Sequence, residues 1–343
     1  MKINTIIQGD AKKELKKLPE QSINMVITSP PYWALRDYEV KGQIGLESTF
    51  QEYVDNLCNI FDEVKRVLKK QGTCWVNIGD TYNSSPIGNQ VDPKRKTAAG
   101  VFSYNHKKNT VKDLPMKCLL QIPSRFAIEM CNRGWILRNE IIWYKPNVMP
   151  SSAMDRFTVD FEKLFLFTKS KKYYFETQYE PYALTSDVRY RQALRAGKSY
   201  NTKEPYKQNT PFIRGKVEAE IKAHVTNPPR YKRGVGSVVS RGDDADGLVV
   251  GGTNPKGRNK RCVWTIPTKP FKGAHFATFP EKLIETPIKA GCPEKGIVLD
   301  CFMGAGTTAM VARRLGRNYL GIELNKEYIA IANKRFAQSI FTF

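Results

Sequence analysis

The feature that most constrains the fold is an alternation of short apolar runs with amphipathic segments, which occurs at both ends of the chain. β-Branched runs of four to seven residues predict buried strands, and apolar residues recurring every three or four positions predict helices. The expected strands are 3–9, 23–29, 73–78, 136–144, 163–168, 296–300 and 318–323, and the expected helices are 11–18, 50–68, 124–133, 281–290, 307–315 and 326–336. This alternation predicts an α/β, Rossmann-like, doubly wound and mostly parallel sheet shared by both ends, with its ligand at the carboxyl ends of the strands.

The clearest of these helices starts after residue 49. Thr49-x-x-Glu52 forms a capping-box pattern, and a long apolar periodicity follows it. Gln71-Gly72 is the expected stop signal, after which the strand at 73–78 begins.

The middle of the chain has a different character. Residues 83–117 show no sustained period and predict a long loop, and loops of this length usually carry function or are disordered. Between 170 and 260 the pattern weakens again into short aromatic and basic clusters. We therefore expect three parts: 1–169 and 261–343 form one domain, and 170–260 is a segment inserted into it.

Charge indicates what the insert binds. The chain has 55 Lys and Arg against 33 Asp and Glu, a formal net charge of +22. Residues 169–261 hold 20 basic and 9 acidic residues, which is half of the excess. Such a field attracts a polyanion or an anionic membrane surface. No apolar run approaches the roughly 20 residues that a membrane span needs, so a membrane-spanning protein is not expected. A solvated basic surface is the alternative explanation of the charge.

The seven cysteines are scattered singly, without a C-x-x-C pair. This spacing predicts neither a zinc site nor a disulfide framework, and a reducing cytoplasm is the expected setting.

A glycine-rich turn stands where the strand at 296–300 meets the next helix. The turn reads DCFMGAGTT from Asp300 to Thr308, and a second acid, Glu323, ends the following strand. Glycines let the backbone approach a ligand, and the amino terminus of a helix offers N–H groups to an anion. Glu323 can accept hydrogen bonds from ribose hydroxyls. On these residues alone, an S-adenosylmethionine site, a dinucleotide site and a merely structural turn all remain open.

An unusual turn also ends the strand at 23–29. It places two prolines and two aromatic residues in succession, Ser29-Pro30-Pro31-Tyr32-Trp33. Prolines fix φ and therefore fix where neighbouring polar groups point. A proline-stiffened loop that merely caps a core strand is the alternative explanation.

Together the two turns resemble the motifs of the DNA amino-methyltransferases, which methylate the exocyclic amine of cytosine or adenine. The tetrapeptide from Ser29 to Tyr32 matches their catalytic (Asp/Asn/Ser)-Pro-Pro-(Tyr/Phe/Trp) pattern, and Asp300, Phe302, Gly304 and Gly306 match their Asp-x-Phe-x-Gly-x-Gly cofactor motif. The catalytic motif precedes the cofactor motif, as in the beta group of this family. The likeness covers 1–180 and 261–336, with small departures at Cys301 and Ala305.

The resemblance implies a class I S-adenosylmethionine-dependent methyltransferase fold and assigns roles to single residues. Asp300 and the glycine turn would hold the methionine part of S-adenosylmethionine, Glu323 its ribose, Asp10 the adenine edge, and Phe302 would pack near the adenine ring. Asp10 can equally be a helix cap. The implied cofactor-binding residues are Asp10, Asp300, Phe302, Gly304, Gly306, Thr307 and Glu323, and the implied catalytic residues are Ser29, Pro30, Pro31 and Tyr32.

The chemistry of the proline turn favours an exocyclic amine as the methyl acceptor. The Ser29 hydroxyl and the Pro30 carbonyl can accept the two amine hydrogens and favour a pyramidal nitrogen, while Tyr32 offers a face to an extruded base. Cytosine C5 methylation needs a nucleophilic cysteine, typically in a Pro-Cys pair, and no Pro-Cys dipeptide occurs. Serine in the first catalytic position is associated within the family with N4-cytosine, and aspartate more with N6-adenine.

We therefore expect a site-specific N4-cytosine methyltransferase acting on duplex DNA, with N6-adenine as the alternative and a restriction endonuclease as a candidate partner. A nicotinamide-dependent oxidoreductase and a non-catalytic DNA-binding protein are the alternatives from other classes. Residues of the insert suited to phosphate contacts are Arg189, Arg191, Arg195, Lys198, Arg230, Lys232 and Arg233.

Overall fold

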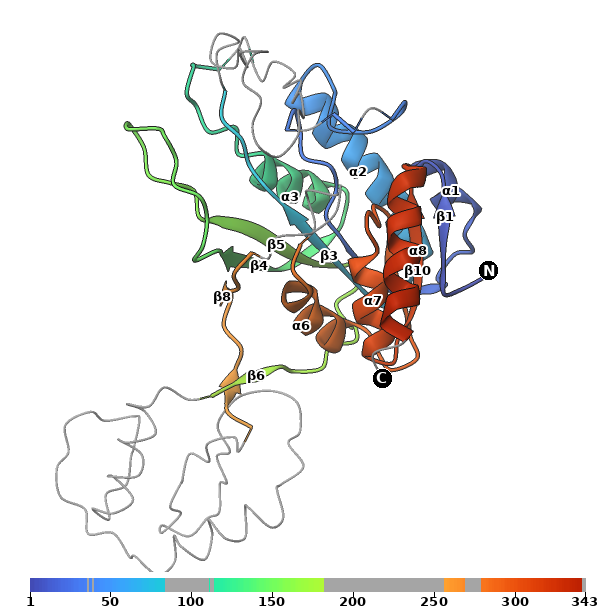
Figure 1. Cartoon of the computed structure of the whole chain (residues 1–343). Coiled ribbons are helices and arrows are strands. Elements are labelled where there is room, and N and C mark those ends of the chain that lie inside the picture. The colour runs from blue at the N-terminus through green and yellow to red at the C-terminus, as the bar shows by residue number, and fades with distance from the viewer. Residues whose placement is uncertain are drawn as a thin grey trace, which may run out of the picture. The chain divides into compact units, whose positions relative to one another are not determined.

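The fold is known from a computed structural model, which describes residues 1–35, 37–38, 40–83, 111, 114–181, 256–268 and 279–340. Its main feature is an eight-stranded sheet in the order β1-β10-β9-β2-β3-β5-β4-β8 (Figure 1). The strands are β1 (Thr5–Gln8), β2 (Ile23–Thr28), β3 (Leu68–Ile78), β4 (Ile136–Tyr144), β5 (Phe161–Thr168), β8 (Val263–Thr265), β9 (Ile297–Asp300) and β10 (Asn318–Glu323).

The sheet is built from both ends of the chain. β1 pairs parallel with β10, β10 with β9, β9 with β2, and β2 with β3. β5 runs antiparallel to both β3 and β4, and β4 pairs parallel with β8. The prediction of a mostly parallel, doubly wound sheet shared by the two ends is thus confirmed.

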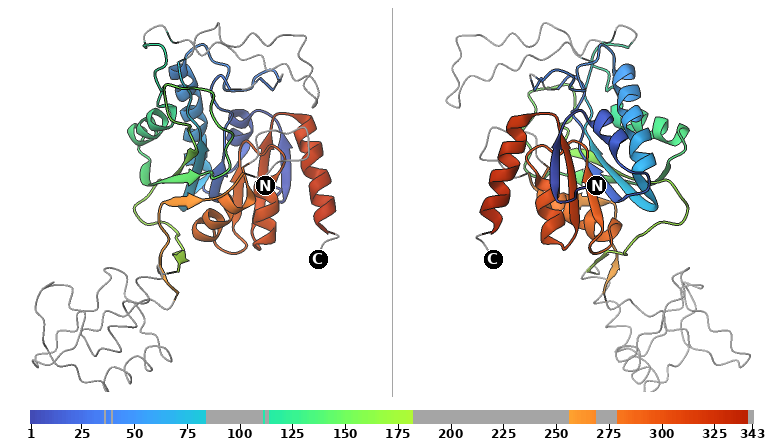
Figure 2. Two further views of the ribbon diagram at one scale, coloured as in Figure 1. Left: turned by 60° about the vertical axis from the view of Figure 1, so that its left-hand side comes forward. Right: turned by 90° about the vertical axis from the view of Figure 1, so that its right-hand side faces the viewer.

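Helices cover both faces of this sheet. On one side lie α1 (Ala11–Lys17), α2 (Phe50–Val67) and α3 (Ile122–Asn132); on the other lie α6 (Glu281–Gly291), α7 (Thr307–Arg314) and α8 (Lys326–Ile340). Figure 2 shows the two helical layers with the sheet between them.

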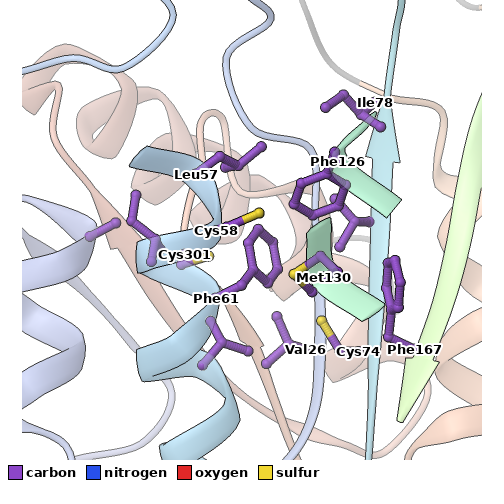
Figure 3. Packing of buried hydrophobic residues seen from close by; sticks show 14 of the residues in the cluster. Val26, Leu57, Cys58, Phe61, Cys74, Ile78, Phe126, Met130, Phe167 and Cys301 are labelled. Carbon is purple, nitrogen blue, oxygen red and sulfur yellow. The ribbon is translucent and has the colours of Figure 1, made fainter. Parts of the chain in front are cut away.

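Successive side chains of each strand point to opposite faces of the sheet and pack into two hydrophobic cores, one under each layer of helices. On β5, Phe165 and Phe167 pack with α2 and α3, whereas Leu164 and Leu166 pack with the opposite layer. Figure 3 shows the first core, where Phe61 and Phe126 meet edge to face at a centroid distance of 5.3 Å. Because each buried strand fills both cores, the carboxyl ends of the strands are held rigidly with respect to one another.

The α2 helix begins as predicted and ends earlier. The Thr49 side chain accepts from the backbone N–H of Glu52, and the Glu52 side chain accepts in return, so the capping box is present. The helix stops at Val67, and β3 starts directly at Leu68 rather than at 73. Gly72 marks an irregularity in β3, because the pairing with β2 jumps from Leu68 to Thr73 there.

Three short strands were not predicted, namely β6 (Tyr179–Glu180), β7 (Arg258–Asn259) and β8. The chain divides into two units, Met1–Glu176 with Cys262–Phe343, and Thr177–Arg261. In the second unit the structure describes only the two ends, where β6 and β7 pair antiparallel. The predicted insert of 170–260 overlaps this unit, and its role in DNA recognition stays a prediction.

No helix in the described part of the chain is both long enough and apolar enough to cross a membrane.

Candidate active site

A pocket lies where several strands of the sheet end together. Asp300 ends β9, Glu323 ends β10, Asp10 follows β1 and Ser29 follows β2, and all four line the pocket. It encloses about 920 Å³ of empty space, counting the part open to solvent. Its lining residues are Gly9, Asp10, Ala11, Ser29, Pro31, Tyr38, Val40, Gly42, Gln43, Ile44, Ile60, Phe279, Asp300, Cys301, Phe302, Met303, Gly304, Ala305, Thr307, Glu323, Leu324, Asn325 and Tyr328.

The glycine turn takes a conformation that requires glycine. Gly304 has φ of +52° and Gly306 has φ of +80°, both in the left-handed region. A Cβ on Gly306 would also lie 2.8 Å from the Ala332 Cβ on α8. Gly306 is the N-cap of α7, and no described side chain caps that helix end. The N–H groups of its first turn are therefore available to an anionic part of a ligand.

Asp300 holds this turn from within. Its Oδ1 accepts from the Thr28 hydroxyl at 2.5 Å and from the Phe302 N–H at 3.0 Å, and its Oδ2 accepts from the Thr308 hydroxyl at 2.6 Å. Burial, with 1% of the residue exposed, raises the pKa of the carboxyl to about 6 in spite of these hydrogen bonds, which favour the charged form. Both oxygens are thus engaged inside the protein, so the geometry gives Asp300 mainly the role of holding the turn.

Glu323 ties the second strand end to the same turn. Its Oε2 accepts from the Gly304 N–H at 2.7 Å, and its Oε1 accepts from the Asn325 N–H at 2.8 Å. Burial raises the pKa of this carboxyl. Each oxygen keeps a lone pair that a ligand hydroxyl can use.

Arg335 of α8 supports the turn from behind and was not predicted. Its Nη1 donates to the Ala305 carbonyl at 2.6 Å and contacts the Thr307 Oγ1 at 3.1 Å. Burial lowers the pKa of this guanidinium. Sequence alone gives no signal for it, because α8 meets the turn only in the folded chain.

Asp10 serves two purposes at once. It is the N-cap of α1, where its Oδ1 accepts from the Lys13 N–H at 2.9 Å, and it also lines the pocket. The helix-cap explanation is therefore correct, and it leaves the other carboxylate oxygen able to face a ligand.

The proline turn is braced by neighbours distant in sequence. Pro30 is buried, while Ser29 and Pro31 line the pocket. The Pro31 carbonyl accepts from the Tyr53 hydroxyl of α2 at 2.8 Å. The turn closes where the Ala34 N–H donates to the Gly45 carbonyl at 2.8 Å, and Trp33 is core, with its Nε1 donating to the Glu47 carbonyl at 3.1 Å.

Tyr32 stands beside the pocket and joins a polar cluster. Its hydroxyl lies 2.7 Å from the Glu162 Oε2, 3.3 Å from the Asn77 Oδ1 and 3.4 Å from the Ser29 Oγ. Glu162 in turn accepts from Lys145. Burial and the charge of Glu162 raise the pKa of the Tyr32 hydroxyl, which keeps it protonated.

Most of the predicted site residues meet at this pocket. Pro30, Tyr32 and Gly306 are not among its lining residues, whereas the other predicted catalytic and cofactor-binding residues line it. Residues missed by sequence reasoning include Tyr38 and Tyr328, whose rings meet edge to face at 6.1 Å. Phe279, just before α6, also lines the pocket.

Other predicted residues cannot be placed. Arg189, Arg191, Arg195, Lys198, Arg230, Lys232 and Arg233 lie outside the described residues, as does most of the predicted 83–117 loop. Within the described residues, no group of three or more His, Cys, Asp or Glu side chains could hold a metal ion.

Sequence comparison finds relatives along nearly the whole chain. The family model described as DNA methylase, covering N6 and N4 methyltransferases, matches residues 23–334. The type II methyltransferase M.Cfr9I of Citrobacter freundii is 38% identical over 331 residues, which cover 96% of this chain and 87% of that protein. M.SmaI of Serratia marcescens is 34% identical over 331 residues, which cover 96% of this chain and 89% of that protein.

Structure comparison finds the same fold in solved proteins. The PvuII DNA methyltransferase, described as cytosine-N4-specific, aligns with a TM-score of 0.57 at 20% identity, covering 98% of this chain and 87% of that one. A putative DNA modification methylase from Thermus thermophilus, solved in complex with S-adenosyl-L-methionine, aligns with a TM-score of 0.53 at 20% identity, covering 98% and 94%.

Proposed function

This chain belongs to the DNA methylase family of N6 and N4 methyltransferases, and from that premise we propose that it methylates the N4 amine of cytosine in duplex DNA. S-adenosylmethionine is the methyl donor that the family assignment implies.

One observation carries the proposal. The proline turn after β2 and the glycine turn after β9 open onto the same pocket, and the Thr28 hydroxyl joins their bases by donating to Asp300 at 2.5 Å. A cofactor held by one turn and an amine held by the other would therefore meet in one cavity. An oxidoreductase built on the glycine turn would leave the turn from Ser29 to Tyr32 without a purpose.

The pocket residues fit the proposed cofactor. The uncapped amino terminus of α7 suits a carboxylate, Glu323 and Asp10 offer acceptors for hydroxyl and amine hydrogens, and Phe302 offers an apolar face. When bound, the cofactor would supply an electrophilic methyl group on a sulfonium centre.

The chain's own part in the reaction is to position the amine. A cytosine amine is a poor nucleophile, because its lone pair is delocalised into the ring. Ser29 Oγ and the Pro30 carbonyl would accept its two hydrogens and favour a pyramidal nitrogen. Such positioning can remove roughly 7 to 11 kcal/mol of barrier.

The base must leave the duplex to reach this site. Extrusion costs a few kcal/mol, which stacking partly offsets. We assign the stacking to Tyr32, whose ring is packed so closely against Gly79 that a Cβ there would lie 2.6 Å from the Tyr32 Cε2. The contact with Gly79 therefore fixes the position of the Tyr32 ring.

Cytosine is preferred to adenine on two grounds. Ser29 occupies the first catalytic position, and the PvuII methyltransferase of the same fold is described as cytosine-N4-specific.

We further propose that the basic insert of 170–260 binds DNA and that the enzyme works beside a restriction endonuclease. The first proposal is supported by the charge of the insert, and the second by relatives named type II methyltransferases. Replacing Arg189, Arg191 and Arg195 with glutamine should lower both the DNA affinity and its dependence on salt. Unchanged affinity and salt slope would contradict the assignment.

The function is tested by single-molecule sequencing of DNA from a host that expresses the chain, with a host expressing Ser29→Ala as the control. We expect N4-methylcytosine at one short sequence in the first host and a much lower modified fraction of the same sites in the second. N6-methyladenine would overturn the choice of base, and the absence of any new modification would overturn the activity.

A further inference from the structure

The hydroxyl of Tyr32 has three polar neighbours, of which two can only accept a hydrogen bond and one can donate or accept. The Glu162 Oε2 lies at 2.7 Å and the Asn77 Oδ1 at 3.3 Å, and each of these atoms can only accept. The third neighbour, the Ser29 hydroxyl at 3.4 Å, can either donate or accept. The direction of the hydrogen between Ser29 and Tyr32 is therefore decided by the other two groups.

Both acceptors are held in place. Lys145, which follows the end of β4, donates to the Glu162 Oε1, so this oxygen points at Lys145 and the other points at Tyr32. The Asn77 Nδ2 donates to the Lys163 carbonyl at 3.2 Å, which turns the Asn77 oxygen toward Tyr32. The side chains of Lys145 and Glu162 are only 16% and 17% exposed, so water competes little for this pair.

The consequence follows from counting hydrogens. Tyr32 has a single hydroxyl hydrogen, and the charged, shorter contact to Glu162 takes it. The Tyr32 oxygen then has only lone pairs to offer to Ser29, so the Ser29 hydroxyl must donate to it. Ser29 Oγ is left presenting lone pairs to the pocket.

We propose that Glu162 is a positioning residue that makes Ser29 an obligate hydrogen-bond acceptor toward the pocket, and so matches the site to a substrate group that donates, such as an amine. This inference rests on the proposed function, and it concerns the polarity of the site rather than the place of the Tyr32 ring. That place is set independently by Gly79, because the ring already fills the space where a Cβ would stand.

The first test is Glu162→Gln. Lys145 would draw the amide oxygen of the new side chain, which leaves the amide N–H facing Tyr32. The Tyr32 hydrogen would then turn to the Asn77 Oδ1, and the new N–H would compete with the Ser29 hydroxyl for the Tyr32 oxygen, which releases the Ser29 hydrogen into the pocket. We expect kcat for methyl transfer to fall about 10- to 100-fold, with KM for S-adenosylmethionine and for DNA within about twofold of the wild-type values.

A matched control lies on the same two strands. Glu140 of β4 pairs with Lys163 of β5 at 2.7 Å and does not line the pocket. Glu140→Gln makes the same chemical change to a Lys–Glu pair and should leave kcat unaltered. Thermal melting and S-adenosylmethionine binding of each variant show that it is folded.

The decisive test is a double-mutant cycle with Tyr32→Phe, which removes the hydroxyl through which Glu162 acts. In the Tyr32→Phe background, Glu162→Gln should cause no further loss of kcat. The inference would be overturned if the double variant lost kcat by the product of the two single-variant losses. It would also be overturned if Glu162→Gln kept the wild-type kcat. Failure of the wild-type protein to methylate DNA would instead overturn the proposed function, so the two failures are distinguishable.

Discussion

The two turns at the edge of the sheet reach rigidity by different means. The glycine turn after β9 has hydrogen bonds within its own stretch, because Phe302 and Thr308 both donate to Asp300, and Thr28, Glu323 and Arg335 add bonds from neighbouring elements. The proline turn after β2 is held from outside, by Tyr53 of α2 and by Asn77 and Glu162 of β3 and β5.

The difference suits the role that is proposed for each turn. A cofactor site needs a close backbone approach and free N–H groups, which a short glycine-rich sequence supplies by itself. An acceptor site for an amine needs polar atoms aimed in set directions, and those are supplied by side chains from several strands. The Thr28–Asp300 hydrogen bond joins the two turns at their bases.

The largest effect is expected at the proline turn. Ser29→Ala removes one of two proposed acceptors for the amine and should cut methyl transfer about 100- to 1000-fold. S-adenosylmethionine affinity should stay close to wild type, because the glycine turn is untouched. Single-turnover transfer and calorimetric cofactor binding measure the two quantities.

Its matched control is Ser22→Ala, at the opposite end of β2. Ser22 donates to the Pro19 carbonyl at 2.8 Å, away from the pocket. Transfer by this variant should equal the wild-type rate. An equal loss at both serines would show that the effect of Ser29 is general to the strand.

The next effect concerns the buried acid of the glycine turn. The folded pKa of Asp300, about 6, lies above its unfolded value of 3.8, so the folded state binds more protons between these values and loses stability as pH rises through them. The Asp300→Asn variant has no carboxyl at this position, so it does not lose this stability as pH rises. Its free energy of unfolding, relative to wild type, should increase by at most about 3 kcal/mol between pH 4 and 6.5.

Denaturant unfolding across that pH range measures the difference. Cofactor binding should weaken in the same variant, because an amide cannot accept at both of its ends. Parallel stability curves for the two proteins would contradict the account of Asp300.

A comparable effect separates steric fit from backbone strain in the glycine turn. Gly306→Ala meets both a φ of +80° and the Ala332 Cβ at 2.8 Å, whereas Gly316→Ala meets a φ of +71° and open space. We expect a loss of about 1 kcal/mol for Gly316→Ala and about 2 to 4 kcal/mol for Gly306→Ala. Only Gly306→Ala should weaken cofactor binding, and equal losses would argue against tight packing of the turn on α8.

The smallest effect is expected at Tyr53, whose hydroxyl donates from α2 to the proline turn. Tyr53→Phe removes the hydrogen bond to the Pro31 carbonyl and should lower the free energy of unfolding by about 1 kcal/mol. Tyr174→Phe, which loses only a 3.5 Å contact to Glu176, should cost less. A Tyr53→Phe protein with wild-type stability and activity would show that the prolines alone hold the turn.

The same contrast explains how much of the site could be predicted. Asp300, Glu323, Asp10 and Ser29 were identifiable because each stands at the end of a strand, and strand ends of a parallel sheet converge. The start of the strand after α2 was misplaced at 73, because Leu68 already pairs with Ile23. Glu162 and Arg335 could not have been found, since their roles depend on strands and helices that meet only after folding.

The central claim is that the two turns bring a methyl donor and a cytosine amine together. The direct test is to incubate the protein with methyl-labelled S-adenosylmethionine and mixed-sequence duplex DNA, digest the DNA to nucleosides and identify the labelled one. We predict label on N4-methylcytosine alone. Label on another nucleoside, or no label in DNA at all, would contradict the account.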